Sequence, residues 1–173
     1  MSLSLYKPNS KNTGCAFNFS IGVNRNGEPA LYISAIRQHT WNDKTKSGSF
    51  SENRSNPDKN INVKLNEFEA GAIINSIKNR YEYSTFHSYE ENKTSIKFTP
   101  WDKKTKTQNG EITVPAFGLN IIRNGSQTFR IPIEAGETEN LIILMKEFIK
   151  SLMSYRKEKQ FRDQKTKDKD APF

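Results

Sequence analysis

The chain has 173 residues, enough for one ordinary domain with its own hydrophobic core. Lysine and arginine number 27 against 19 acidic residues, and the resulting formal charge of +8 favours binding to polyanions. The single cysteine, Cys15, excludes an intramolecular disulfide framework and a cysteine-rich zinc site. Since no apolar run is long enough for a signal peptide or a membrane span, we expect a soluble, cytoplasmic protein.

The first part of the chain predicts two strands joined by a tight turn. Apolar and polar residues alternate at residues 17–21, Asn and Gly at 24–27 are typical of a hairpin turn, and residues 30–41 predict a long strand. Residues 1–14 and 42–59 are polar, so we expect irregular chain there.

Residues 60–80 predict a strand that runs directly into a helix. Residues 60–65 alternate between apolar and polar side chains. Asn66 then starts the helix, with Glu69 three residues later as an asparagine version of the capping box. The expected apolar stripe of this helix consists of Phe68, Ala70, Ile73, Ile74 and Ile77.

The second half repeats this order. Its expected elements are strands at residues 81–89, 94–101, 112–122 and 127–133 and a helix from about Thr138. Residues 102–110 read as a basic polar loop, Asn124-Gly125 as a hairpin turn, and Pro115 with Gly118 favours an edge position or a bulge.

These elements predict an α+β fold with antiparallel sheets. We expect one domain at residues 15–153, made of two strand-rich repeats at about 15–80 and 81–153 that each end in a helix. Beyond residue 154 the apolar periodicity stops, so residues 154–173 are expected to form a flexible, disordered charged tail.

Little in the sequence supports catalysis. His39 and His87 have no metal-ligand spacing around them, and the sequence contains neither a phosphate-binding loop nor a nucleophile elbow. The adjacent acids Glu90 and Glu91 are typical of a solvated turn. We therefore expect no cofactor, no metal site and no enzymatic activity.

Cations and tryptophans recur together. Arg37 lies four positions before Trp41, and Lys97 lies four positions before Trp101, so each pair would share one face of a strand. The lysines that follow are Lys44 and Lys46 in the first case and Lys103, Lys104 and Lys106 in the second. Rings beside cations suit single-stranded nucleic acid, because bases stack on the rings while the cations contact phosphates. The alternative is that both tryptophans are core residues that close the sheet ends.

Residues 17–77 resemble the transcription coactivator positive cofactor four. The resemblance rests on a strand ending in Ile36-Arg37, Trp41 a few residues later, a basic loop, and a strand ending in Leu65-Asn66 before an amphipathic helix. That family binds single-stranded DNA on a curved antiparallel sheet, which implies DNA contacts by Arg37, Trp41 and Lys59.

Two copies of such a unit in one chain are similar to the plant Whirly proteins and the mitochondrial guide-RNA-binding proteins. The resemblance implies a Whirly-like fold and the possibility of homo-oligomers. In the second copy it rests on the order of elements and on the pair Lys97 and Trp101.

The last residues resemble the C-terminal tip of bacterial single-stranded DNA-binding proteins. Asp168, Asp170, Pro172 and Phe173 match that tip, whereas Lys167 and Lys169 depart from its acidic character. The resemblance implies recruitment of replication or recombination enzymes through the terminal phenylalanine and its carboxylate.

The sequence therefore predicts a sequence-tolerant single-stranded DNA-binding protein for replication or recombination, in a bacterial or phage-infected cell. The expected nucleic-acid-binding residues are Arg25, Arg37, Trp41, Lys44, Lys46, Lys59, Lys97, Trp101, Lys103 and Lys104. An RNA-binding or RNA-annealing protein and a transcription cofactor of the same fold are the open alternatives.

Overall fold

The computed structural model describes the backbone of residues 1–169 and the side chains of residues 1–164. Its elements are β1 (Ser2–Lys7), β2 (Cys15–Val23), β3 (Pro29–Arg37), β4 (Thr40–Asn42), β5 (Ser47–Ser49), a 3-10 turn (Ser51–Asn53), β6 (Asn60–Leu65), α1 (Glu67–Asn79), β7 (Tyr83–Tyr89), β8 (Asn92–Thr107), β9 (Gly110–Arg123), β10 (Gln127–Ile133) and α2 (Ala135–Lys169).

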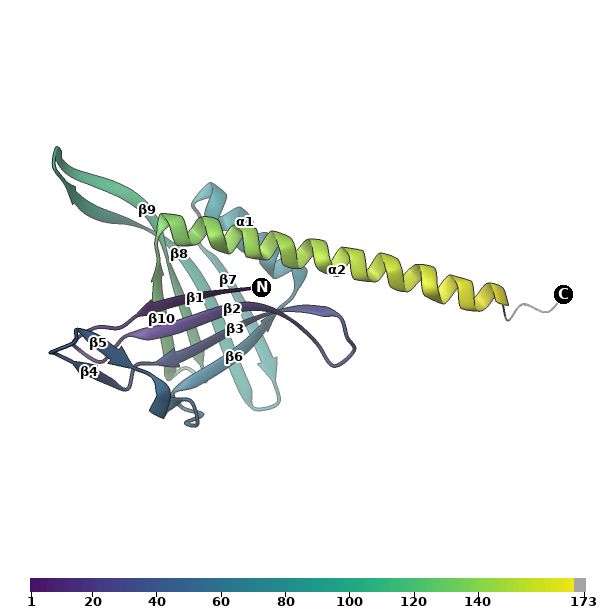
Figure 1. The fold of residues 1–173 in the computed structure, drawn as a ribbon, viewed down its shortest axis with the longest axis horizontal. Coiled ribbons are helices and arrows are strands. Elements are labelled where there is room, and N and C mark those ends of the chain that lie inside the picture. Colours follow the sequence, from purple (N-terminus) through teal and green to yellow (C-terminus); the bar gives the residue numbers. More distant parts are fainter. Residues whose placement is uncertain (170–173) are drawn as a thin grey trace.

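The described part of the chain forms two four-stranded antiparallel sheets and one small hairpin (Figure 1). β1, β2, β3 and β6 form the N-terminal sheet, β7, β8, β9 and β10 form the C-terminal sheet, and β4 pairs with β5. In both large sheets the strands lie side by side in chain order, and a helix follows the last strand. The predicted α+β class is confirmed, whereas a duplication behind the two similar halves stays a prediction.

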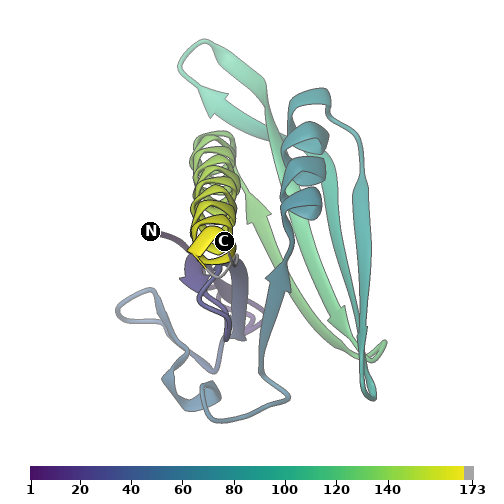
Figure 2. The same ribbon diagram turned by 90° about the vertical axis from the view of Figure 1, so that its right-hand side faces the viewer.

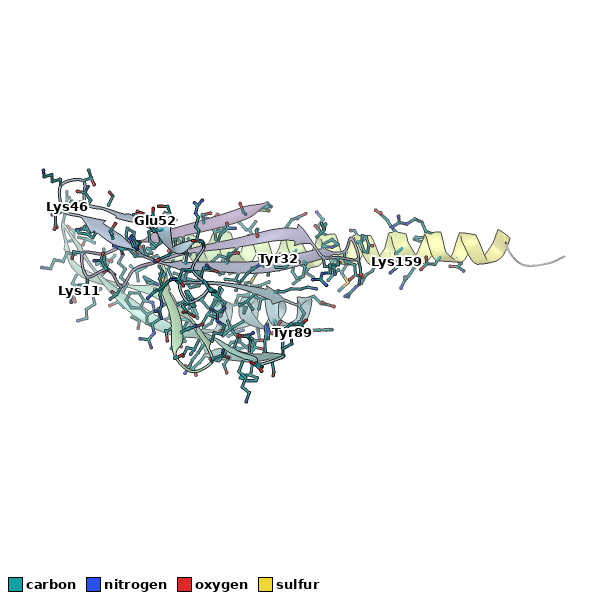
Figure 3. All side chains as sticks on the ribbon, turned by 90° about the horizontal axis from the view of Figure 1, so that it is seen from below. Lys11, Tyr32, Lys46, Glu52, Tyr89 and Lys159 are labelled. Atoms are coloured by element: carbon teal, nitrogen blue, oxygen red, sulfur yellow. The ribbon has the colours of Figure 1, made fainter. Side chains whose placement is uncertain are left out.

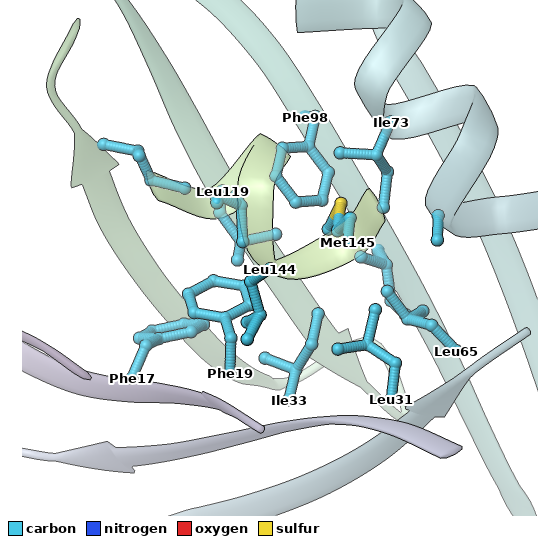
Figure 4. Close-up of a cluster of buried hydrophobic side chains, with 14 of the residues drawn as sticks. Phe17, Phe19, Leu31, Ile33, Leu65, Ile73, Phe98, Leu119, Leu144 and Met145 are labelled. Atoms are coloured by element: carbon cyan, nitrogen blue, oxygen red, sulfur yellow. The ribbon is translucent and has the colours of Figure 1, made fainter. Parts of the chain in front are cut away.

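The core lies between the inner faces of the two sheets and the helices. α2 packs against strands of both sheets, and Figure 2, which looks along α2, shows it lying between them. Strand alternation sends the large apolar side chains inward, where they meet α1 and α2 (Figure 4). Fully buried examples are Phe17, Phe19, Leu31, Ile33, Leu65, Ile73, Phe98 and Leu119. Each large sheet therefore has one buried face and one outer face.

The predicted capping box at the start of α1 is confirmed. Asn66 Oδ1 accepts a hydrogen bond from the Glu69 amide, and Glu69 Oε2 accepts one from the Asn66 amide, both at 2.9 Å. Glu69 Oε1 also accepts from the Thr85 hydroxyl at 2.7 Å and lies 2.6 Å from His87 Nε2. Burial alone would raise the pKa of Glu69, but these hydrogen bonds hold it below its ordinary value. One carboxylate thus joins α1 to β7.

Replacing Glu69 with alanine is expected to lower the free energy of unfolding at pH 7 by about 2–3 kcal/mol, because a helix cap and two buried hydrogen bonds are lost. Since the folded-state pKa is depressed, this stabilisation exists above the unfolded pKa of about 4.3 and is lost as the pH falls through the folded-state value. Urea titrations at pH 7 and pH 3 measure both effects. Glu139→Ala, an exposed carboxylate on α2, is the control, and an equal loss there would contradict the expectation.

The sequence predicted Phe68 to belong to the buried stripe of α1, and this prediction is wrong. Phe68 is 79% exposed, whereas Ala70, Ile73, Ile74 and Ile77 are buried as expected. Helical spacing alone allows Phe68 to lie at the edge of the apolar stripe or outside it. As α1 packs in the structure, Phe68 points to solvent.

Three segments that the sequence predicted as loops or irregular chain contain strands, and one of them is β5 within residues 42–59. Residues 2–7 form β1, which pairs with β2, and residues 102–107 continue β8 into a long hairpin with the start of β9. The hairpin forms because the lysines of this segment alternate with threonines that suit a pleated strand. Pro115 lies where β9 has β8 alone as its neighbour, so the edge position is confirmed for Pro115. It is wrong for Gly118, which pairs with both β8 and β10.

The long strand predicted at residues 30–41 is broken. β3 ends at Arg37, and Trp41 lies on β4, which pairs with β5 instead of the N-terminal sheet. The break is at Gln38, whose buried side-chain amide donates to the carbonyls of Asn9 and Thr40. Arg37 and Trp41 therefore do not share a strand face, which corrects the prediction.

The sequence predicted that the chain becomes irregular after residue 154, and this is wrong for the part that the structure describes. α2 continues to Lys169, because lysine, arginine, glutamate and glutamine propagate a helix that packing has already nucleated. Residues 170–173, with Asp170, Pro172 and Phe173, lie outside the described residues. Neither helix, over the residues described, has the length and hydropathy to cross a membrane.

Candidate nucleic-acid interface

The outer face of the C-terminal sheet is the surface of interest. Along β8, Ile96 and Phe98 point into the core, so Ser95, Lys97 and Thr99 point outward. The buried apolar side chains of β9 and β10 point inward in the same way, and the helices pack on that inner side. This outer face is therefore a sheet surface open to a ligand.

Two large aromatic rings lie on this outer face. Trp101 on β8 is 38% exposed and Phe86 on β7 is 61% exposed, so neither is sealed in the core. Phe86 pairs in register with Ser95, six residues before Trp101 along β8. At about 3.3 Å per residue the two rings are about 20 Å apart, a span that several stacked bases can fill. The alternative reading of Trp101 as a core residue is wrong.

Cations and neutral polar groups lie between and beside the rings. Lys97 is on the outer face and forms an ion pair with Glu82 at 2.8 Å, while Arg130 on β10 donates to Asn120 at 3.3 Å. The register places Lys97 opposite Asn120 and Asn120 opposite Arg130, so these side chains form one row across three strands. Such a row can pair with phosphates while the rings hold the bases.

A groove, here called the junction groove, follows the β10 edge of this sheet. One part, about 400 Å3 in volume, is lined by Trp101, Lys7 and Arg130 together with the loop after β1. The adjoining part, about 460 Å3, is lined by Arg37, Lys59 and again Arg130. The structure thus brings three sequence-predicted residues, Arg37, Lys59 and Trp101, to one connected surface.

Arg37 also holds the two sheets together at this groove. Its Nε donates to the carbonyl of Thr128 at 2.8 Å, and its guanidinium lies 5.4 Å from the centre of the Phe129 ring. Nearby, burial raises the pKa of the Cys15 thiol, against the lowering effect of the Arg130 amide. Arg37 covers an edge strand that would otherwise present a free carbonyl. A substitution there would disturb the fold as well as any ligand contact.

Acidic residues at the start of α2 neutralise two lysines beside Trp101. Lys7 Nζ lies 2.6 Å from Glu137, and Lys103 Nζ lies 2.7 Å from Glu134. The ammonium group of Lys103, together with Lys7, holds the pKa of Glu134 below its ordinary value. A phosphate that approaches this end of the groove must compete with these carboxylates.

Other predicted residues lie away from the two large sheet faces. Trp41, Lys44 and Lys46 are on the β4–β5 hairpin, where Asp43 accepts from the Trp41 indole at 3.1 Å and pairs with Lys46 at 3.6 Å. Lys104 lies on the β8–β9 hairpin and pairs with Glu111 at 3.2 Å. Figure 1 shows both hairpins projecting at the same end of the molecule.

Arg25 lies far from this surface. It is in the β2–β3 turn at the other end of the N-terminal sheet, next to Asn26, whose carbonyl accepts from Tyr155 of α2 (Figure 1). The backbone of Asp168 is in α2, and the other predicted tip residues are outside the described chain. The position of Arg25 therefore gives no support to its predicted role in nucleic-acid binding.

Sequence reasoning missed Phe86, Arg130 and Lys7. Phe86 lies in a run of aromatic residues that predicts a strand but not which face is covered, and Arg130 was treated as one polar member of an alternating strand. For Phe86 and Arg130 the available signal was their outward alternation with buried neighbours, whereas Lys7 lies on the same side of β1 as the buried Leu5. Over the residues described, no group of three histidine, cysteine or acidic side chains could hold a metal ion.

Two solved plant structures share this architecture. WHY1 from Arabidopsis thaliana aligns at 14% identity with a TM-score of 0.57, over 100% of this chain and 95% of that one. The fold is therefore similar to that of WHY1. The plant transcriptional regulator PBF-2 aligns at 15% identity with a TM-score of 0.55, over 91% and 93% of the two chains. No protein-family model and no curated protein matches the sequence. The Whirly-like fold predicted from the sequence is thus confirmed at the level of the fold.

Proposed function

We propose that this protein binds single-stranded DNA, with little sequence preference, on the outer face of the C-terminal sheet and in the junction groove. The observation that carries the proposal is the pair of exposed rings, Trp101 and Phe86, on a sheet face that also carries Lys97 and Arg130. Unpaired bases stack on such rings, whereas duplex DNA keeps its bases enclosed. The Whirly fold of the chain is consistent with this use.

Fluorescence anisotropy with a 30-nucleotide strand, as DNA and as RNA, and with the matching DNA duplex tests the proposal. Single-stranded DNA is expected to bind most tightly, with a slope of log affinity against log salt of about −0.7 for each neutralised phosphate. Equal binding of the duplex would contradict it. Tighter binding of RNA would select the RNA-binding alternative, because the 2′-hydroxyl distinguishes the two strands.

The cellular role is part of the same proposal. A sequence-tolerant binder serves replication or recombination in the cytoplasm of a bacterial or phage-infected cell, whereas the name of PBF-2, a transcriptional regulator, supports the transcription cofactor as the second candidate. Co-purification of replication enzymes or of RNA polymerase with the tagged protein separates these roles. Self-association, expected from the Whirly resemblance, is measured by analytical ultracentrifugation.

We also propose that the C-terminal tip recruits partner enzymes. A terminal phenylalanine beside its own carboxylate suits an apolar pocket with a basic rim. Deleting Ala171–Phe173 is expected to leave DNA affinity unchanged and to abolish pull-down of those enzymes. Retention of the same enzymes by the shortened protein would refute this role.

A further inference from the structure

The outer face of the N-terminal sheet is also uncovered, but it is nearly free of charge. One row across its four strands consists of serine and asparagine in register: Ser4, Asn18, Ser34 and Asn62. The next row consists of Tyr6, Ala16, Ile36 and Asn60. A neutral hydrogen-bonding row thus lies beside a mostly apolar one.

A hollow of about 410 Å3 lies where these two rows meet. Ala16 is the smallest side chain there, with the larger Tyr6 and Ile36 on its neighbouring strands, so the surface is concave at this point. The volume lies within the range of cavities that hold small ligands, about 300–1,000 Å3. Arg54, from the segment before β6, forms part of the rim.

The ring of Tyr6 is fixed in place at this hollow. Its hydroxyl donates to the Gly48 carbonyl at 2.5 Å and accepts from the Gly48 amide at 3.2 Å, and its ring centre lies 5.1 Å from that of Phe50. The side chain is nevertheless 52% exposed, so part of the ring remains available. A ring held in this way loses little conformational entropy when a flat ligand stacks on it.

Hydrogen-bond donors with no partner face the same hollow. Asn18 Oδ1 accepts from Ser4 at 3.0 Å and Asn62 Oδ1 accepts from Ser34 at 3.2 Å, which leaves both amide Nδ2 groups without a partner in the described part of the protein. These donors suit the ring-nitrogen and carbonyl acceptors of a base edge.

Arg54 supplies the positive charge of the hollow. Asn60 Nδ2 donates to the carbonyls of Asn53, Arg54 and Asn56, which fixes the turn that carries this arginine. Its guanidinium has no ion-pair or hydrogen-bond partner among the described side chains, and no acidic residue lines the hollow. The charge is therefore available for an anion.

We infer that this hollow is a second site, which takes one nucleotide. The base lies over Ala16 and Ile36 against Tyr6, its edge accepts from Asn18 and Asn62, and its phosphate pairs with Arg54. The inference rests on the proposed function where the nucleotide belongs to a bound DNA strand. A free mononucleotide offers the same chemistry, and the experiment below separates the two sources.

The test uses the full chain with Ala16→Leu, which fills the hollow, and Arg54→Ala, which removes the charge. Lys64→Ala, on the same sheet face outside the hollow, is the matched control. Side-chain amide signals of Asn18 and Asn62 are followed by NMR during titration with thymidine 5′-monophosphate and, separately, with a 30-nucleotide thymidine strand. Circular dichroism checks that every variant is folded.

If the strand supplies the nucleotide, the 30-mer shifts both amide signals, and each test variant lowers its affinity by about tenfold while Lys64→Ala does not. If free nucleotides are the ligand, the monophosphate shifts the signals in the wild type but not in Ala16→Leu. Unmoved amide signals in both titrations would overturn the site. Loss of strand binding in Trp101→Ala, with unmoved amides, would overturn the second site alone and leave the proposed function standing.

Discussion

Replacing Trp101 and Phe86 with alanine is expected to weaken binding of single-stranded DNA by about 5- to 150-fold for each ring. The expectation follows from stacking, which contributes roughly 1–3 kcal/mol per base. Both rings are partly exposed on a sheet face whose opposite side makes the core, so the thermal unfolding transition should change little. Fluorescence anisotropy with a 30-nucleotide strand measures the single variants and the double variant.

Phe68→Ala is the matched control for this experiment. Phe68 is an aromatic side chain that is 79% exposed, but it lies on α1 instead of the outer sheet face. Its removal should leave the affinity unchanged. Wild-type affinity in the Trp101 and Phe86 double variant would exclude the outer face of the C-terminal sheet as the binding surface.

Replacing Lys59 and Arg130 with alanine should make binding less sensitive to salt. Both residues line the junction groove, and each phosphate contact contributes about 0.7 to the salt slope on a single strand, so the double variant should lose about 1.4 from its magnitude. The affinity should fall similarly for every sequence tested, because phosphate contacts carry no sequence information. Titrations between 50 and 300 mM salt, about the range where such contacts dominate, measure the slope.

The double variant Lys78→Ala with Lys146→Ala removes the same formal charge from exposed helix positions. It separates a local contact from the general attraction of a basic protein for a polyanion. Equal slopes for the two double variants would show that net charge alone governs binding, and the junction groove would lose its role.

The strand at residues 60–65 and the start of α1 were predictable because every signal there is local. Ile61, Val63 and Leu65 alternate with polar residues, and the Asn66–Glu69 box lies within one helical turn. The hairpin turn at Asn124-Gly125 is equally local, since both residues adopt positive φ there. Such patterns are complete within a few residues and need no knowledge of distant packing.

The errors occurred where distant parts of the chain decide the outcome. Nothing near Gln38 shows that its side chain is bound by the loop at Asn9, so the chain reversal that separates Arg37 from Trp41 was not visible. Phe86 shows the same limit for the site. An outward aromatic residue on a strand reads like an inward one until its neighbours across the sheet are known. The prediction that Lys97 and Trp101 share a strand face is confirmed, because both residues lie on one unbroken strand.

Helix α2 extends beyond the two sheets and makes the molecule elongated. The side chain of Arg156 still contacts Glu67 of α1 at 2.6 Å, but the following residues extend away from the sheets (Figures 1 and 3). From Arg156 to Lys169 the helical rise carries the chain about 20 Å outward. Residues 156–169 carry seven basic and three acidic residues, so this part of the helix places net positive charge well beyond the two sheets. The attraction of this charge for any polyanion would act at a distance from the sheets and would weaken as salt is added.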